Sequence, residues 1–269
     1  MLAFGLILAL FIGVTLGLVG SGGSILTVPV FVYVLGVDPN LATTYSLLAI
    51  AVSSSVGSIR NFALKRVKMN ELMLFGIPSV ITVFLTRQFL LPLVPDEFNI
   101  GEWVLHQNTV LMLIFAGLMF VSGYRMVRSA EILQVGAPRQ LPNYVMILQG
   151  ALLGFITGGV GAGGGFLIIP ALVNFYRMPI SYAVATSLAI ISFNSFFGLA
   201  GDLEKVHLFD WRILGPYTLI LIVGMFTGFY VNKYFRGEQL KKGLGYLILA
   251  IGCFILLQEL VEIWSIFRS

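Results

Sequence analysis

The chain has 269 residues, of which 58% are hydrophobic and only 10% are charged, and its mean hydropathy is +0.97. Soluble domains carry roughly a quarter charged residues, so a chain this apolar cannot cover a water-facing surface and must use lipid as its solvent. The net charge of +4 is spread over short loops, which does not indicate nucleic-acid binding. The one cysteine and two isolated histidines give no metal-ligand spacing, so we expect no metal and no cofactor.

The apolar stretches predict an all-α, polytopic membrane protein. Most approach the ~20 residues that a helix needs to cross the hydrocarbon core. We expect the first stretch to be a retained helix, because it lacks the basic n-region of a signal peptide. Two stretches are too short to cross, and each follows directly on a glycine cluster. In chain order the stretches are Leu2–Val19, Ile25–Leu35, Leu41–Val56, Leu72–Val94, Trp103–Val127, Tyr144–Val160, Phe166–Phe175, Tyr182–Leu199, Ile213–Val231 and Leu244–Trp264.

The two halves of the chain resemble each other. The cluster Gly20–Ser24 aligns with Gly161–Gly165, and the register continues without a gap, so that Ser54 falls on Ser195. Each half contains a glycine-broken helical hairpin followed by three long helices. We therefore predict one transport domain made of two transmembrane repeats, residues 1–130 and residues 140–269.

The distribution of basic residues predicts the orientation. Loops Arg60–Lys68 and Lys233–Lys242 are basic, and by the positive-inside rule they lie in the cytoplasm. The loop Asp202–Arg212 is then on the other side, although it is the repeat partner of Arg60–Lys68. The repeats are therefore expected to be inverted, with both termini on the non-cytoplasmic side of a cell (inner) membrane. This orientation places most of the 16 basic residues inside.

The glycine clusters are the predicted substrate site. Inverted repeats with broken helices are typical of secondary transporters, whose substrate sites lie near the midplane where the half-helices begin. The short helices after Gly20–Ser24 and Gly161–Gly165 would direct their N-termini at the clusters. A helix N-terminus carries about half a positive charge, so two such ends can bind an anion without a buried Lys or Arg. The alternative is that these glycines only permit close helix packing.

The helix after each cluster carries small and polar residues at three-and-four spacing, which would line the pathway. Hydroxyl bonds to the helix's own carbonyls are the alternative for each Ser or Thr. Asn194 is the most informative, because an amide at mid-depth needs several partners. The candidate substrate-binding residues are Gly20, Ser21, Gly22, Gly23, Ser24, Ser46, Ser53, Gly161, Ala162, Gly163, Gly164, Gly165, Thr186, Ser187 and Asn194.

Three further polar residues are weaker candidates. Thr27 would add a hydroxyl donor beside the first cluster, and Gln149 is a polar residue within an apolar span. Arg87 could meet the substrate at the outer mouth, but we expect its long side chain to snorkel to the lipid headgroups.

At the glycine clusters the sequence resembles the TauE/SafE family of sulfite exporters, also called the TSUP family. The resemblance covers nearly the whole chain and depends on three segments: Gly20–Ser24 with Pro29, Gly161–Gly165 with Pro170, and Ala185–Leu188. It implies transport of small sulfur-containing anions such as sulfite, thiosulfate or sulfonates. The first repeat has Thr44-Tyr45-Ser46 in place of the commoner Ala-Thr-Ser.

These observations predict a secondary transporter of small sulfur-containing anions that works by alternating access about a midplane site. Export is favoured, because an anion leaving a negative interior gains about 2.3 kcal/mol per charge per 100 mV. An anion channel or uniporter with the glycine clusters as its filter is the alternative. We expect no enzymatic activity, since the spans contain no nucleophile–base pair or paired acids. The expected partners are a small anion and the lipid bilayer; the sequence does not fix the oligomeric state.

Overall fold

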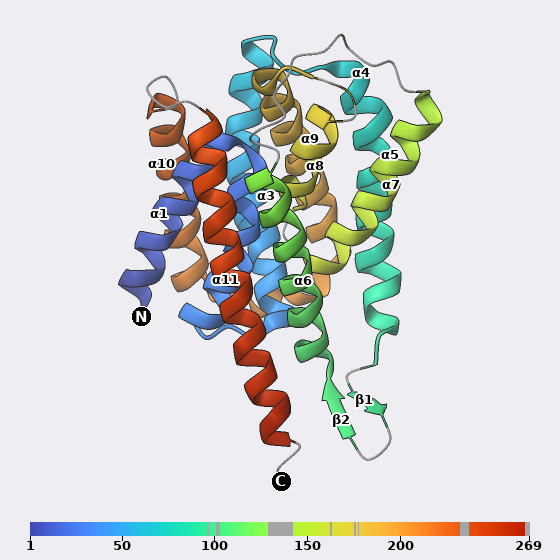
Figure 1. Ribbon diagram of the computed structural model, residues 1–269, viewed down its shortest axis with the longest axis vertical. Coiled ribbons are helices and arrows are strands. Elements are labelled where there is room, and N and C mark those ends of the chain that lie inside the picture. The colour runs from blue at the N-terminus through green and yellow to red at the C-terminus, as the bar shows by residue number, and fades with distance from the viewer. Residues whose placement is uncertain are drawn as a thin grey trace.

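The computed structural model describes residues 1–95, 97–100, 103–128, 142–161, 163–174, 176, 178–231 and 237–266. Over these residues the protein is almost entirely helical (Figure 1). Seven helical spans are long and apolar enough to cross a membrane. The prediction of an all-α, polytopic membrane protein is therefore confirmed.

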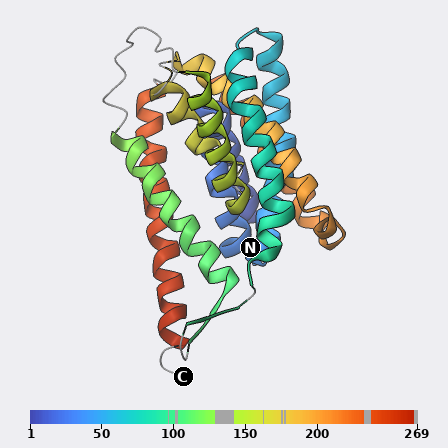
Figure 2. The same ribbon diagram turned by 90° about the vertical axis from the view of Figure 1, so that its right-hand side faces the viewer.

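The long spans follow the predicted apolar stretches closely, because a helix in lipid needs an uninterrupted apolar run. The last of the described helices, α11, is also long, and it runs beside α6 (Figure 2). Residues 69–93 form one continuous span of mixed helical type, made of α4 (Met69–Glu71), η3 (Leu72–Gly76), α5 (Ile77–Leu85), η4 (Thr86–Leu90) and η5 (Leu91–Leu93). The other long helices are α1 (Leu2–Val19), α3 (Pro39–Ala63), α6 (Gln107–Arg128), α7 (Asn143–Val160), α9 (Ile180–Gly201), α10 (Trp211–Val231) and α11 (Gly237–Ile266). A short 3₁₀ helix, η7 (Leu203–Leu208), joins α9 to α10.

One expected span begins later than predicted. The residues from Trp103 to His106 form strand β2, which pairs antiparallel with β1 (Glu97–Ile100), and α6 starts only at Gln107. Trp and Val suit a strand as well as an apolar helix, so hydropathy alone could not separate the two. The hairpin lies at the end of the molecule where α11 also ends (Figure 1).

Helices α3 and α9 form the centre of the protein. In their apolar stretches 72% and 67% of residues are buried, compared with 33–44% in the other long spans. The two helices run antiparallel: Thr44, near the start of α3, donates a hydrogen bond to Asp202, which follows α9, over 2.8 Å. Further along, the hydroxyls of Ser55 and Ser192 lie 2.6 Å apart. The polar faces predicted on these helices therefore lie in the protein interior.

Two pairs of parallel helices flank this centre, and both depend on glycine. Gly13 and Gly17 of α1 lie against Gly224 and Gly228 of α10, so closely that an added Cβ would meet the opposite backbone. In the same way Gly150, Gly154 and Gly158 of α7 lie against the span that contains α5. Such close approach is the small-residue packing typical of membrane helices. Packing thus accounts for these glycines, which lie outside the two clusters.

The two short helices pack against each other near the centre. The first is irregular and consists of η1 (Ser21–Leu26), α2 (Thr27–Pro29) and η2 (Val30–Val34). The second is α8 (Gly165–Asn174). The second starts where the sequence predicted. The first starts about four residues earlier than expected, because the residues after Gly20 already form a 3₁₀ turn.

Candidate functional site

The second glycine cluster is a true break between two helices. Gly161 ends α7 in the left-handed region with φ of 73°, and its N–H donates to the Thr157 carbonyl over 2.9 Å. Gly163 and Gly164 also have positive φ, of 64° and 73°, and α8 begins at Gly165. Three left-handed residues in one turn require glycine, which alone adopts this conformation without strain. Ala162 lies outside the described residues.

This turn inserts between the two central helices. A Cβ added to Gly163 would lie 2.8 Å from Ser195 Oγ and 3.1 Å from side-chain carbons of Ile50 and Ile191. Ile50 belongs to α3 and the other two residues to α9. Ser195 is fully buried, and its hydroxyl has no hydrogen-bond partner among the described residues. A polar group without a partner therefore faces the start of a half-helix.

The first glycine cluster has a different environment. Gly20 has φ of 77° and lies against Val184 of α9 and Ile169 of α8, both apolar. Gly23 packs back onto α1, where an added Cβ would collide with Thr15. Ser24 and Thr27 are fully buried in this short helix. Ser21 and Gly22 begin η1, and only their backbone is described.

The hydroxyls of the α3 polar face divide into two kinds. Ser53 donates to the carbonyl of Ala49, in its own helix, over 2.8 Å. Its hydroxyl is thus satisfied locally, as the back-bonding alternative proposes. Ser46 is fully buried, and its hydroxyl has no partner among the described residues. Ser46 therefore keeps a polar atom available to a ligand.

The predicted residues of α9 divide in the same way. Ser187 donates to the Val184 carbonyl in its own helix over 2.9 Å, and Thr186 accepts a hydrogen bond from the Lys68 backbone N–H over 3.0 Å. Asn194 donates to Ser79 Oγ over 2.8 Å, while its buried Oδ1 has no partner among the described residues. Of the three, Asn194 is the one with a buried side-chain atom, the acceptor Oδ1, that has no partner among the described residues.

Gln149 lies apart from the clusters. Its Oε1 accepts a hydrogen bond of 2.7 Å from the Tyr176 hydroxyl, which connects α7 to the segment after α8. Its amide is part of the contact between α7 and the segment after α8, and the described contacts do not bring it to the glycine turns.

Arg87 is the clearest correction to the sequence analysis, because it does not snorkel to the headgroups. Its side chain is fully buried and forms an ion pair with Asp202. Its Nε also donates to the Gly158 carbonyl over 2.6 Å, and its Nη1 to Thr43 Oγ1 over 3.1 Å. Partners from α3, from α7 and from the residue after α9 bind Nε and Nη1 inside the protein, so the headgroup region offers the guanidinium no advantage.

The sequence analysis missed the partners of this arginine. Asp202 is 95% buried, although it follows the last apolar residue of its span. Two threonines near the start of α3 complete the contacts: Thr43 accepts a hydrogen bond from Arg87, and Thr44 donates one to Asp202. A signal existed, since an acid directly after an apolar span can pair with a base at the same depth in another span.

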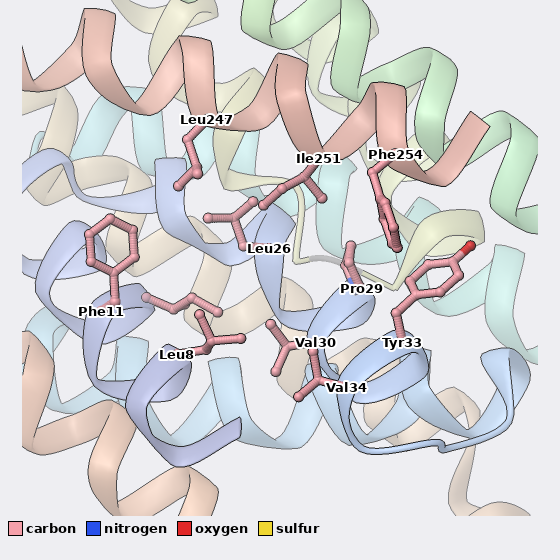
Figure 3. Close-up of a pocket in the computed structure, with 11 residues that line it drawn as sticks. Leu8, Phe11, Leu26, Pro29, Val30, Tyr33, Val34, Leu247, Ile251 and Phe254 are labelled. Atoms are coloured by element: carbon pink, nitrogen blue, oxygen red, sulfur yellow. The ribbon is translucent and has the colours of Figure 1, made fainter. Parts of the chain in front are cut away.

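The cavity in Figure 3 is of another chemical kind. It has a volume of about 240 Å³ and lies between α1, the first short helix and α11. Its walls are aliphatic and aromatic, and the hydroxyl of Tyr33, the polar group in its lining, donates to Glu259 over 2.7 Å. Such a lining suits hydrocarbon and not an anion, so the glycine turns remain the better candidate for anion binding.

The chain matches a known protein family over nearly its whole length. The family described as sulfite exporter TauE/SafE matches residues 5–255. The chain belongs to this family. It is therefore a multi-pass membrane transporter of the TauE/SafE family, as the resemblance implied.

Individual relatives match between 81% and 92% of the chain. A "probable membrane transporter protein" of Xylella fastidiosa (strain 9a5c) is 29% identical over 257 residues, which is 91% of each chain. A protein of the same name from Xylella fastidiosa (strain Temecula1) is 32% identical and covers 81% of this chain and 78% of its own. The "probable membrane transporter protein YunE" of Bacillus subtilis is 24% identical and covers 92% and 94%. No solved structure matches the chain.

Proposed function

We propose that this protein is a secondary transporter that exports small sulfur-containing anions, of the sulfite, thiosulfate or sulfonate type, by alternating access. The observation that carries the proposal is the second glycine turn, which lies between α3 and α9 and faces the unpartnered hydroxyl of Ser195. Backbone without helical hydrogen bonds is tolerated at membrane depth only inside protein or beside water. A site for a small polar ligand gives such a turn a function.

The charge of the proposed ligand suits this location. The N-terminus of α8 begins one residue after the turn and carries a partial positive charge. Ser46 and Ser195 each keep a buried hydroxyl without a described partner, and the amide nitrogen of Asn194 carries two N–H groups, one of which binds Ser79. A small oxyanion accepts several hydrogen bonds at once, which matches donors arranged around a helix N-terminus.

The helix pairing supports the proposal of two inverted repeats, residues 1–130 and 140–269. The antiparallel pair α3 and α9 consists of the helices that follow the two clusters. The parallel pairs of α1 with α10, and of α7 with α5, each join the first helix of one half to a helix of the other half. We further propose that both termini are non-cytoplasmic, because the basic loops then lie inside.

Transport by reconstituted protein tests the function. We expect proteoliposomes to take up labelled sulfite or thiosulfate, with saturation and with acceleration by unlabelled anion on the opposite side. Saturable counterflow supports a carrier, whereas unitary currents without counterflow support an anion channel. Absence of both for all three anion types would contradict the proposed substrate class.

Topology has a separate test. Cysteine substitutions at Lys65 and Lys205 should react with a membrane-impermeant thiol reagent from opposite sides, with Cys253 replaced by Ser to remove the native thiol. Labelling of both positions from the same side would contradict the inverted arrangement.

A further inference from the structure

Arg87 joins several elements at one end of the central helix pair. It lies in η4, at the end of the span formed by residues 69–93, and its side chain contacts α3, α7 and the residue after α9. Gly201 permits this position, because a Cβ there would lie 2.7 Å from Arg87 Cβ. A cation is thus held inside the protein by backbone and side-chain acceptors.

One nitrogen of this guanidinium is unused. Nε and Nη1 have the acceptors described above, but the buried Nη2 has no hydrogen-bond partner among the described residues. This Nη2 lies directly against Gly161, the first left-handed residue of the second glycine turn, where a Cβ would collide with it. The donor without a partner therefore lies at the turn that the proposed function assigns to the anion.

The carboxylate of Asp202 has two basic neighbours. Its Oδ2 binds Arg87 and accepts the hydrogen bond of 2.8 Å from Thr44. Its Oδ1 lies 3.8 Å from Nζ of Lys205, whose side chain is 33% exposed. Asp202 is therefore placed between a fully buried cation and a cation near the protein surface.

We propose that Arg87 is the charged anchor of the transported anion, and that Asp202 is the carboxylate that competes with the anion for this anchor and moves towards Lys205 when the anion binds. The proposal deepens and depends on the proposed function. A buried guanidinium requires a negative partner, and an oxyanion can replace a carboxylate because both present two oxygens to the planar N–H fork. The exchange keeps Arg87 paired before and after binding.

Thermal unfolding of the purified full-length protein tests the exchange. Asp202→Asn removes the competing charge at nearly constant size. Without anion this variant should unfold at a lower temperature than the wild type, because Arg87 loses its partner. With sulfite or thiosulfate the upward shift should exceed that of the wild type, and the Kd should fall about tenfold or more, since a hydrogen bond to a charged group is involved. Sodium gluconate at equal ionic strength is the control.

The double variant Arg87→Gln/Asp202→Asn should lose this anion-dependent stabilisation. A shift in Asp202→Asn equal to or smaller than that of the wild type would overturn the proposal, and so would a full shift in the double variant. A wild-type protein that transports these anions while Asp202→Asn shows no gain would leave the proposed function standing and reject the exchange alone.

If Asp202→Asn does not fold, Lys205→Gln decides the question. It leaves the buried pair intact but removes the second partner of Asp202, so the Kd for the anion should rise several-fold. Arg212→Gln, an exposed basic residue at the same end, is the matched control for lost surface charge and should not change the Kd as much. Equal effects of the two variants would overturn the proposal.

Discussion

The two glycine clusters are alike in sequence and differ in structure. In the first, Gly20 turns the chain and lies against Val184 and Ile169, and η1 follows immediately. In the second, three glycines with positive φ precede α8, and the turn faces Arg87 and Ser195. One cluster meets apolar side chains and the other meets a cation and an unpartnered hydroxyl.

This difference indicates a division of roles between the halves. In the proposed repeat alignment Asn61 stands at the position of Asp202, and its amide donates to the Gly57 carbonyl in its own helix over 2.9 Å. Among the described residues, the position that corresponds to Asp202 therefore forms no buried ion pair. Under the proposed function, an anion that crosses the protein would meet the buried Arg87–Asp202 pair at one end of α3 and α9 and other contacts at the opposite end.

The largest effect should come from Gly163→Val. A β-branched residue at φ of 64° is strained, and its Cβ would press on Ser195, Ile50 and Ile191. We expect no measurable anion counterflow in proteoliposomes. Gly36→Val is the matched control, because Gly36 has φ of 69° but no atom within 4 Å of an added Cβ.

The Gly36 variant should share the backbone strain and still transport. Size-exclusion chromatography of both variants separates loss of folding from loss of the site. Normal counterflow by folded Gly163→Val would show that the second glycine turn is not the binding site.

The fold was largely predictable because lipid imposes a simple rule. A run of about 20 apolar residues must form a helix, so the spans from α1 to α10 follow from hydropathy, with the largest error at the end of α3, which runs to Ala63 and not to Val56. The segment that starts at Trp103 differs in type, since three apolar residues and His106 complete a hairpin there. Burial of Arg87 was not predictable from its own neighbourhood, because its partner Asp202 lies 115 positions away in the chain.

The candidate site was predictable in position more than in detail. The clusters identified where helices break, but spacing could not distinguish Ser46, whose hydroxyl has no partner in the described part of the chain, from Ser53, which bonds to Ala49. That distinction depends on side-chain rotamers, and a helix allows both for serine.

A second, smaller effect is expected for Asn194→Leu. The change removes an amide nitrogen with two N–H groups, only one of which binds Ser79, and it puts a larger apolar side chain at a buried position. The affinity for the anion should fall about a hundredfold, the upper end of the cost of a lost hydrogen bond to a charged group. Ser79→Ala is the control, since it removes only the hydroxyl that Asn194 binds. An equal loss in both variants, measured by anion titration, would assign the effect to the Asn194–Ser79 contact alone.

A third comparison uses Ser195 and its repeat partner Ser54. Ser195→Ala should weaken anion binding about tenfold, because a hydrogen bond to a charged group is lost. The same change should not lower the unfolding temperature, since the hydroxyl is buried without a partner in the absence of ligand. Ser54→Ala removes a hydroxyl that donates to the Ile50 carbonyl over 2.5 Å, and it should leave binding unchanged. Equal binding losses would contradict the assignment of the anion to the second turn.

The smallest effects should come from the hydroxyls that bond to their own helices. Ser53→Ala and Ser187→Ala each remove a donor already occupied by a carbonyl of α3 or α9, so the Kd for sulfite or thiosulfate should change less than about twofold. Ser46→Ala, by contrast, removes a buried hydroxyl with no described partner and should weaken binding several-fold if the anion reaches α3. Isothermal titration of the three variants decides this point. A loss at Ser53 as large as at Ser46 would mean that α3 rotates during binding and that its hydroxyls exchange the helix carbonyls for the anion.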